Sequence, residues 1–129
     1  MTHAWAAGFF EADGSIFLKQ FYHPSESVRP WVTATQNDPA PLERLVELYG
    51  GGILQVKTPK GKPHWRWRLI KSVEIEYFAT CVWPYMTPGP KRDKIKIAYH
   101  MVPCIIGEGC RSYGRQRRRK KLEATFRSL

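Results

Sequence analysis

The sequence predicts an α+β domain in which one antiparallel sheet of four strands has helices on one face only. Three observations support this fold class: the strand patterns form two hairpins, a helical pattern precedes each hairpin, and further helical patterns follow the second. The chain has 129 residues, of which 43% are hydrophobic, enough to bury one core. We expect one folded domain over residues 1–109 and a separate basic tail over residues 110–129.

The first helix is predicted over residues 3–12, between a cap at Thr2 and a stop at Gly14. Its end carries two acids, Glu11 and Asp13. The negative pole of the helix dipole lies at that end, so each acid costs about 0.3 to 1 kcal/mol there. Acids in an unfavourable position suggest a role other than helix stability.

A stripe of small residues runs along this helix at a spacing of four: Ala4, Gly8 and Ala12. Such a stripe allows a second helix backbone to pack very closely, although the stripe alone is better explained by a helix tucked under its own sheet. The acids at the helix end favour the first interpretation. If a symmetry-related copy packed along it, two Asp13 carboxylates would meet near the two-fold axis. A divalent cation between them would remove the repulsion.

The two hairpins account for the sheet. Residues 15–23 and 31–36 form the first, joined by a turn over residues 24–30, and residues 53–58 and 64–70 flank the turn P-K-G-K-P of the second. Between the hairpins, Pro39 and Pro41 open a helix with apolar positions Leu42, Leu45, Val46 and Tyr49, which Gly50-Gly51-Gly52 ends. Helical patterns resume at about 72–82 and 91–106, separated by T-P-G-P.

The face of the sheet without helices is predicted to carry polar, basic and aromatic side chains. Alternate residues counted from Asp13 share this face. The candidates for nucleic-acid contact are Lys19, Arg29, Trp31, Thr33, Thr35, Gln55, Lys57, His64, Arg66 and Arg68, with Ser15, Phe17 and Phe21 on the same face. These side-chain types read base edges. Half-buried sheets always present polar residues to water, but the only acid in these hairpins is Glu26.

Charge favours a nucleic-acid partner. The chain has 21 lysines and arginines against 11 acids, a net charge of +10. A membrane surface would also attract this charge, but no apolar run approaches the ~20 residues of a spanning helix, and the N-terminus lacks the features of a signal peptide. We therefore expect a soluble protein that is not exported. Its three cysteines have no C-x-x-C spacing, so neither a disulfide framework nor a zinc site is expected.

The stretch A-A-G-F-F-E-A-D-G at residues 6–14 resembles the signature nonapeptide of the LAGLIDADG homing endonucleases. The order of predicted elements is similar to the αββαββα core of that family, in which the sheet forms an open DNA-binding saddle. The similarity covers roughly the first 105 residues. Family members with one motif per chain act as homodimers, and the motif occurs once here. The resemblance therefore implies a homodimer, with Ala4, Gly8 and Ala12 at its interface.

The resemblance also implies the site residues. The last acid of the motif binds the catalytic metal together with the carbonyl before it, which assigns these roles to Asp13 and Ala12. Glu11 is not expected to be the main ligand. A polar residue at the end of the second strand corresponds to Gln36, and a lysine ahead of the long C-terminal helix corresponds to Lys91, with Lys94 as its rival. The implied cofactor is Mg²⁺ or another divalent cation.

The implied function is sequence-specific cleavage of double-stranded DNA, by metal-dependent phosphodiester hydrolysis that leaves 3′ overhangs. An RNA splicing maturase for introns, or a DNA-binding regulator that does not cleave, remains an alternative. A homodimer on DNA needs no membrane and no small-molecule substrate. No targeting signal is seen, so we expect the cytoplasm of a bacterial or phage host, or an organellar matrix.

The tail carries R-S-Y-G-R-Q-R-R-R-K-K from residue 111, with seven cations in eleven residues. Leu122, Phe126 and Leu129 then follow at helical spacing and could form a short amphipathic helix. A solvated charge run is an equally good interpretation of the basic stretch. On DNA, we expect it to contact phosphates without adding sequence readout.

Overall fold

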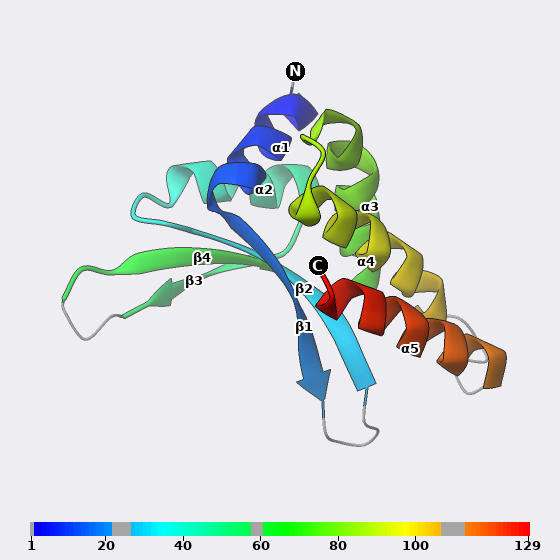
Figure 1. Ribbon diagram of the computed structural model, residues 1–129. Helices are drawn as coiled ribbons and strands as arrows, with labels where there is room; N and C mark the ends of the chain where they lie inside the picture. The colour runs from blue at the N-terminus through cyan, green and yellow to red at the C-terminus, as the bar shows by residue number, and fades with distance from the viewer. Residues whose placement is uncertain (1, 22–26, 58–60, 107–112) are drawn as a thin grey trace.

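The computed structural model describes residues 2–21, 27–57, 61–106 and 113–129 (Figure 1). Its elements follow the order α1 (Thr2–Asp13), β1 (Gly14–Phe21), β2 (Ser27–Gln36), α2 (Ala40–Tyr49), β3 (Gly52–Val56), β4 (His64–Leu69), α3 (Ser72–Val82), a 3₁₀ turn η1 (Trp83–Tyr85), α4 (Pro90–Ile106) and α5 (Tyr113–Arg127). This order confirms the predicted α+β class.

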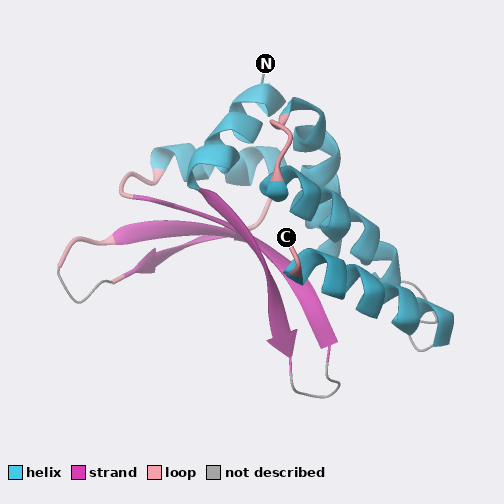
Figure 2. Cartoon of the chain, viewed as in Figure 1, coloured by secondary structure: helices cyan, strands magenta, loops and turns pink. Residues whose placement is uncertain are grey.

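The four strands form one antiparallel sheet in the order β1-β2-β4-β3. Helices α1 to α4 lie on one face, and the opposite face is left open (Figure 2). The β1–β2 and β3–β4 hairpins diverge from a shared centre, which gives the sheet the saddle shape that the family resemblance implies (Figure 1). The open face is therefore long and concave, and it is built from both hairpins.

Strand β2 is longer than predicted, because residues 27–30 pair with β1 instead of forming a turn. Pro30 made this stretch look like a turn in the sequence. In the structure Pro30 is opposite Leu18, and among the described residues β2 pairs with β4 only from Val32 onward. A proline is tolerated where one side of a strand needs no hydrogen bond.

Aromatic side chains hold the helices against the sheet. Phe78 of α3 is fully buried, and its ring meets those of Phe10, Tyr49 and Trp67 edge to face, at centroid distances of 5.3, 4.9 and 5.5 Å. Such pairs contribute about 0.5 to 1.5 kcal/mol each beyond their buried area. The Trp67 indole also donates to the Gly50 carbonyl at 2.9 Å, so its polar atom is satisfied. One cluster thus joins α1, α2, α3 and β4.

The C-terminal helix α5 packs on the domain through its last turns. Phe126 is 5% exposed and belongs to the same hydrophobic core as Phe10 and Phe78. Leu122 is half-buried and Leu129 is exposed. The end of the segment assigned to a basic tail is therefore helical and anchored, whereas the side chains of its basic stretch up to residue 119 lie outside the described residues. No helix in the described ranges is long and apolar enough to cross a membrane.

Candidate active site

The end of α1 and the end of β2 bring two predicted site residues together. The Gln36 Nε2 atom donates to the Asp13 Oδ2 atom at 2.7 Å. Asp13 is exposed, and among the described residues Gln36 is its one hydrogen-bond partner and no cation pairs with it. The carboxylate is therefore oriented by an amide and still has an oxygen open to a ligand.

Chain connectivity explains this meeting. β1 begins directly after Asp13, and Gly14 is opposite Ala34, so the end of α1 is carried to the end of β2. The turn is tight: a Cβ atom at Gly14 would lie 2.1 Å from Cδ2 of the Phe10 ring. Only glycine fits between the helix end and this buried ring.

Lys91 lies at the same helix end but does not bond to Asp13. Its Nζ atom donates to the carbonyl oxygens of Phe10 (3.3 Å), Glu11 (2.9 Å) and Gly14 (2.8 Å). The last carbonyls of a helix lack intrahelical partners, and a cation there is favourable. Lys91 comes from the first turn of α4, so one helix supplies the positive charge that the end of another requires. This charge offsets the electrostatic cost of the acids at the end of α1.

The two acids of the motif have different surroundings. Glu11 accepts hydrogen bonds from the backbone N–H and the hydroxyl of Thr87, the latter at 3.1 Å. Thr87 belongs to the loop before α4, so this contact ties that loop, and with it the start of α4, to α1. Glu11 is engaged within the protein, whereas Asp13 faces outward.

The rival lysine, Lys94, points elsewhere. Its Nζ atom lies 5.4 Å from the centroid of the Phe126 ring, on the side of α4 that faces α5. Of the two candidates, Lys91 is the one at the end of α1.

Two oxygen ligands for a hard cation are available here, the Asp13 carboxylate and the Ala12 carbonyl. The Ala12 oxygen is not among those that Lys91 binds. No group of three or more His, Cys, Asp or Glu side chains that could hold a metal exists in the part of the chain that the structure describes. The residues fit Mg²⁺ in ligand type, but one copy of the chain supplies few of the roughly six oxygens that it takes.

The small stripe on α1 faces outward. Gly8 and Ala12 are exposed, and a Cβ atom built at Gly8 has no atom within 4 Å. α1 instead buries its other side, through Ala6, Ala7 and Phe10. The alternative of a stripe tucked under its own sheet is therefore wrong for Gly8 and Ala12, while Ala4 is half-buried.

The open face of the sheet carries most of the predicted DNA-contact residues. Lys19, Arg29, Thr35 and Arg66 are exposed, and Trp31, His64 and Arg68 are half-buried. Thr33 is on the expected face but is only 8% exposed, a correction to its predicted accessibility. It lies in the centre of the sheet between Ser15 and Arg68, whose side chains flank it.

The predicted position of Gln55 is wrong. β3 pairs with β4 so that Gln55 is opposite Trp65, and Leu54 is opposite Arg66. Paired residues project to the same face, so Gln55 is on the face opposite to that of Arg66 and Arg68. Lys57 follows the end of β3 and is exposed, outside the paired strand.

Two residues near the site were missed by sequence reasoning. Thr87 has no local signal, because its partner Glu11 is 76 positions away. Asn37 directly follows Gln36, and its Oδ1 atom lies 2.5 Å from the His64 Nδ1 atom. The sequence could have identified Asn37 as a candidate site residue, because it is a polar residue directly after the end of a strand.

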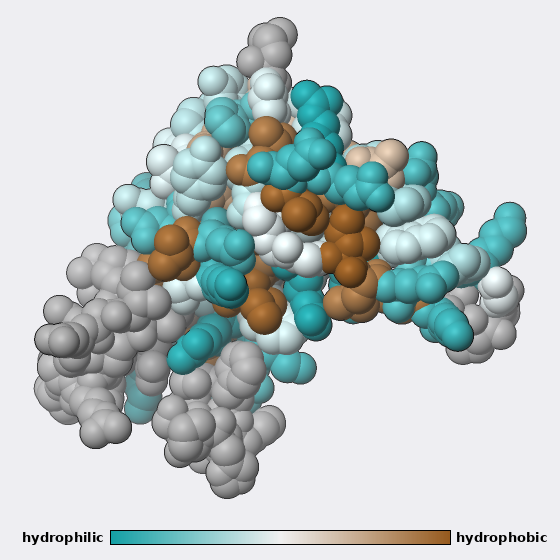
Figure 3. Space-filling view, turned by 180° about the vertical axis from the view of Figure 1, so that it is seen from behind, coloured by the Kyte–Doolittle hydropathy of each residue, from teal (hydrophilic) through white to brown (hydrophobic). Residues whose placement is uncertain are grey.

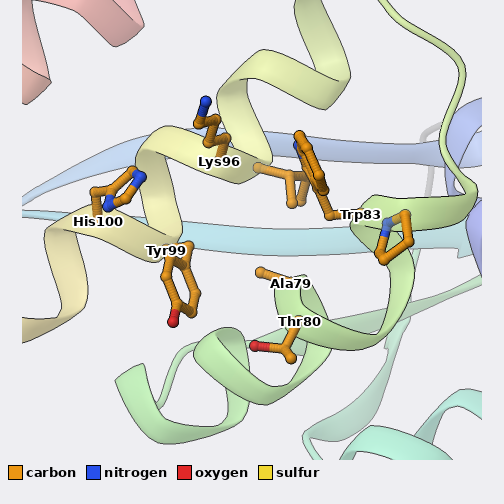
Figure 4. A pocket seen from close by; sticks show the side chains of 8 residues that line it. Ala79, Thr80, Trp83, Lys96, Tyr99 and His100 are labelled. Atoms are coloured by element: carbon orange, nitrogen blue, oxygen red, sulfur yellow. The ribbon is translucent and has the colours of Figure 1, made fainter.

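Two hollows on the surface of the described residues are lined by residues other than Asp13. One of about 290 Å³ is between α3 and α4, where Figure 4 shows Trp83 and Tyr99 on either side of it and Thr80 directed towards it. Another of about 360 Å³ adjoins Gly52 and Lys71. On the face seen from behind, apolar side chains gather in patches with hydrophilic ones between them (Figure 3). Neither hollow contains the residues that meet at the end of α1.

No protein-family model matches the chain, and no curated protein sequence does. Solved structures do match its fold. The archaeal intron-encoded homing endonuclease I-Vdi141I, complexed with DNA, superimposes with a TM-score of 0.78 at 17% identity, covering 98% of this chain and 82% of that one. The homing endonuclease I-CvuI, in complex with a DNA target in the presence of Mg, gives a TM-score of 0.75 at 19% identity, with coverage of 96% and 78%.

A longer neighbour gives the same result. The LAGLIDADG homing endonuclease I-GzeII, in complex with its DNA target, has a TM-score of 0.73 at 19% identity, with 95% of this chain but only 44% of that chain covered. The chain thus has the fold of the LAGLIDADG homing endonucleases. It spans most of the length of some of these proteins and less than half of others.

Proposed function

We propose that the chain is a sequence-specific DNA endonuclease of the homing type, which acts as a homodimer and hydrolyses phosphodiester bonds in both strands with Mg²⁺ or another divalent cation. The observation that carries the proposal is the outward-facing Asp13 carboxylate, bonded to Gln36 beside Lys91, at one end of an open basic sheet. The fold supports it, because the neighbours named above are homing endonucleases solved with DNA.

A homodimer is proposed for two reasons. Gly8 and Ala12 leave the outer side of α1 open to close approach by a second helix. A two-fold axis along this stripe would also bring two Asp13 carboxylates together, which would complete the incomplete set of oxygen ligands.

The chemistry assigns a role to each residue. In the reaction a water oxygen bonds to phosphorus as the bond to the 3′ oxygen breaks, leaving a 5′ phosphate and a 3′ hydroxyl. A divalent cation, when bound, supplies a polarised water and neutralises charge on the phosphate. Asp13 and the Ala12 carbonyl would hold it. Gln36 orients Asp13, and Lys91 fixes the helix end that carries both ligands.

DNA would lie along the concave face of the sheet. Its phosphates would meet Lys19 and the basic tail, and base edges would meet side chains such as Arg66 and Arg68. Half of the duplex site would be read by each copy of the chain. Gln55 is not assigned to this contact, because it is on the other face.

The test uses a library of randomised duplexes incubated with the protein and Mg²⁺, followed by sequencing of the cut ends. We expect one enriched sequence cut in both strands with staggered 3′ overhangs. The matched control is Asp13→Asn, which should bind the same sequence and leave it uncut. If the unmutated protein produces no more ends than the variant, then the chain is a binder of DNA or RNA and not a nuclease.

A further inference from the structure

One aromatic ring organises the centre of the open face. Trp31 of β2 is directly opposite Phe17 of β1, and their ring centroids are 6.1 Å apart. The guanidinium carbon of Arg68 lies 5.1 Å from the centroid of the Trp31 ring, and Lys19 Nζ lies 5.5 Å from it. Two cations from different strands therefore share one indole.

Arg68 and Lys19 differ in how firmly they are held. Arg68 is half-buried, whereas Lys19 is exposed. A planar guanidinium can stack its face on an aromatic ring and still donate hydrogen bonds from its edge, which an ammonium cannot do. In the described ranges the Arg68 side chain makes no hydrogen bond and no ion pair. Its donors therefore remain available to a ligand.

The neighbours of Arg68 leave it open on one side. In the paired strands it lies between Thr33 of β2 and Gly52 of β3. A Cβ atom at Gly52 would have no atom within 4 Å, so space remains beside Arg68 towards the edge of the sheet. The Arg68 side chain thus contacts Trp31 of β2, and space remains between it and the edge strand β3.

We propose that Trp31 is a positioning residue for recognition: its indole holds the Arg68 guanidinium in place so that the edge of that group reads one base, preferentially guanine, of the duplex. This inference rests on the proposed DNA-binding function. A bidentate arginine is the commonest specific contact to guanine, through its O6 and N7 atoms. Fixing the arginine before binding removes the cost of ordering a long side chain.

Arg66 provides an internal comparison. It projects to the same face two residues before Arg68 and is exposed, and no aromatic ring contacts it in the described part of the chain. A base preference that depends on Arg66 should therefore be independent of Trp31.

The test measures equilibrium binding in Ca²⁺ or EDTA, without cleavage, to the duplex that the library selects and to its single-base substitutions. Arg68→Ala should lower the preference at one position by about tenfold or more. Trp31→Leu should lower preference at that same position by about three- to tenfold and leave other positions, including that of Arg66, unchanged. Trp31→Phe should restore most of it. The double variant should lose no more than Arg68→Ala alone.

Two further variants distinguish a loss of base recognition from a folding defect. Arg68→Lys keeps the charge and the native Trp31 but lacks the planar group, so it should lose the same base preference. Lys19→Met removes the ammonium group beside the same ring and should weaken binding to all duplexes equally. The inference is overturned if Trp31→Leu preserves the preference at the Arg68 position, or if it weakens every duplex equally. A protein that selects no duplex sequence at all contradicts the proposed function as well.

Discussion

The Gln36 side chain donates a 2.7 Å hydrogen bond to the Asp13 carboxylate, joining the last residue of β2 to the last residue of α1. This bond places an exposed acid where the sheet and the helical layer meet. Lys91 of α4 donates to carbonyls at the same helix end. Gln36 therefore orients the Asp13 carboxylate, while Lys91 stabilises the backbone on either side of Asp13.

Lys91 should stabilise the fold through the end of α1. Replacing it with methionine removes three hydrogen bonds from a charged donor to carbonyls. We expect Lys91→Met to lower the free energy of unfolding by about 2 kcal/mol in urea titrations. The matched control is Lys94→Met, which among the described residues loses a contact with the Phe126 ring and should cost about 0.5 to 1 kcal/mol. Equal losses would show that Lys91 does not brace the helix end.

Gly8→Leu should convert a dimer into a monomer. The site is open within one chain, so the variant should fold, but its side chain would keep a second helix away. In light scattering the unmutated protein should have about twice the 15.0 kDa mass of one chain, and the variant should have the mass of one chain. Glu47→Leu, at an exposed position of α2, is a control that should stay dimeric. A monomeric unmutated protein would contradict the interface.

Phe126→Ala should destabilise the whole domain. The side chain is 5% exposed and belongs to the main core, so we expect a loss of about 3 to 5 kcal/mol. Leu129→Ala, at a position that is 40% exposed, should change the free energy of unfolding by less than about 0.5 kcal/mol. If both variants melt like the unmutated protein, the C-terminal segment is an independent tail.

Tyr49 should make stability depend on alkaline pH. Burial, with a smaller contribution from the nearby Cys81, raises the pKa of the Tyr49 hydroxyl well above its usual value. Because the folded pKa exceeds the unfolded one, the neutral form stabilises the fold fully below pH ~10, and this stability is lost as pH rises further. Urea titrations from pH 8 to 11 should show a steeper fall for the unmutated protein than for Tyr49→Phe. If the free energy of unfolding falls equally with pH in both proteins, then the Tyr49 hydroxyl does not contribute to this pH dependence.

The sequence predicted most of what local patterns determine. The helical periodicities placed α3 and α4 within one residue of their observed bounds, and the acids after an apolar run identified the end of α1. Strand alternation put Arg66 and Arg68 on the face without helices, and the alternating residues Trp67 and Leu69 are buried on the other face. These features depend on spacing within one segment, which a sequence displays directly.

Features that depend on pairing between segments were harder to predict. Alternation within β3 could not say which of its faces aligns with Arg66, so Gln55 was misplaced. The partners of Lys91 are backbone carbonyls about 80 positions away, and carbonyls leave no mark in a sequence. The burial of Phe126 likewise depends on how α5 returns to the core.

We propose Asp13 as a metal ligand that is held where helix electrostatics disfavour a carboxylate. The most direct measurement compares Asp13→Asn with the unmutated protein, in a plasmid cleavage assay with Mg²⁺ and in thermal melts in EDTA. Asparagine can still accept the bond from Gln36, and it removes a negative charge from the end of α1, a change worth about 0.3 to 1 kcal/mol.

We predict that Asp13→Asn abolishes cutting, binds the target about as well, and melts at the same temperature or slightly higher. Glu11→Gln, whose partner is Thr87, should reduce cutting much less. An Asp13→Asn variant that still cleaves, or one that unfolds without metal, would contradict the account, because the acid at the end of α1 would then serve the fold and not the reaction.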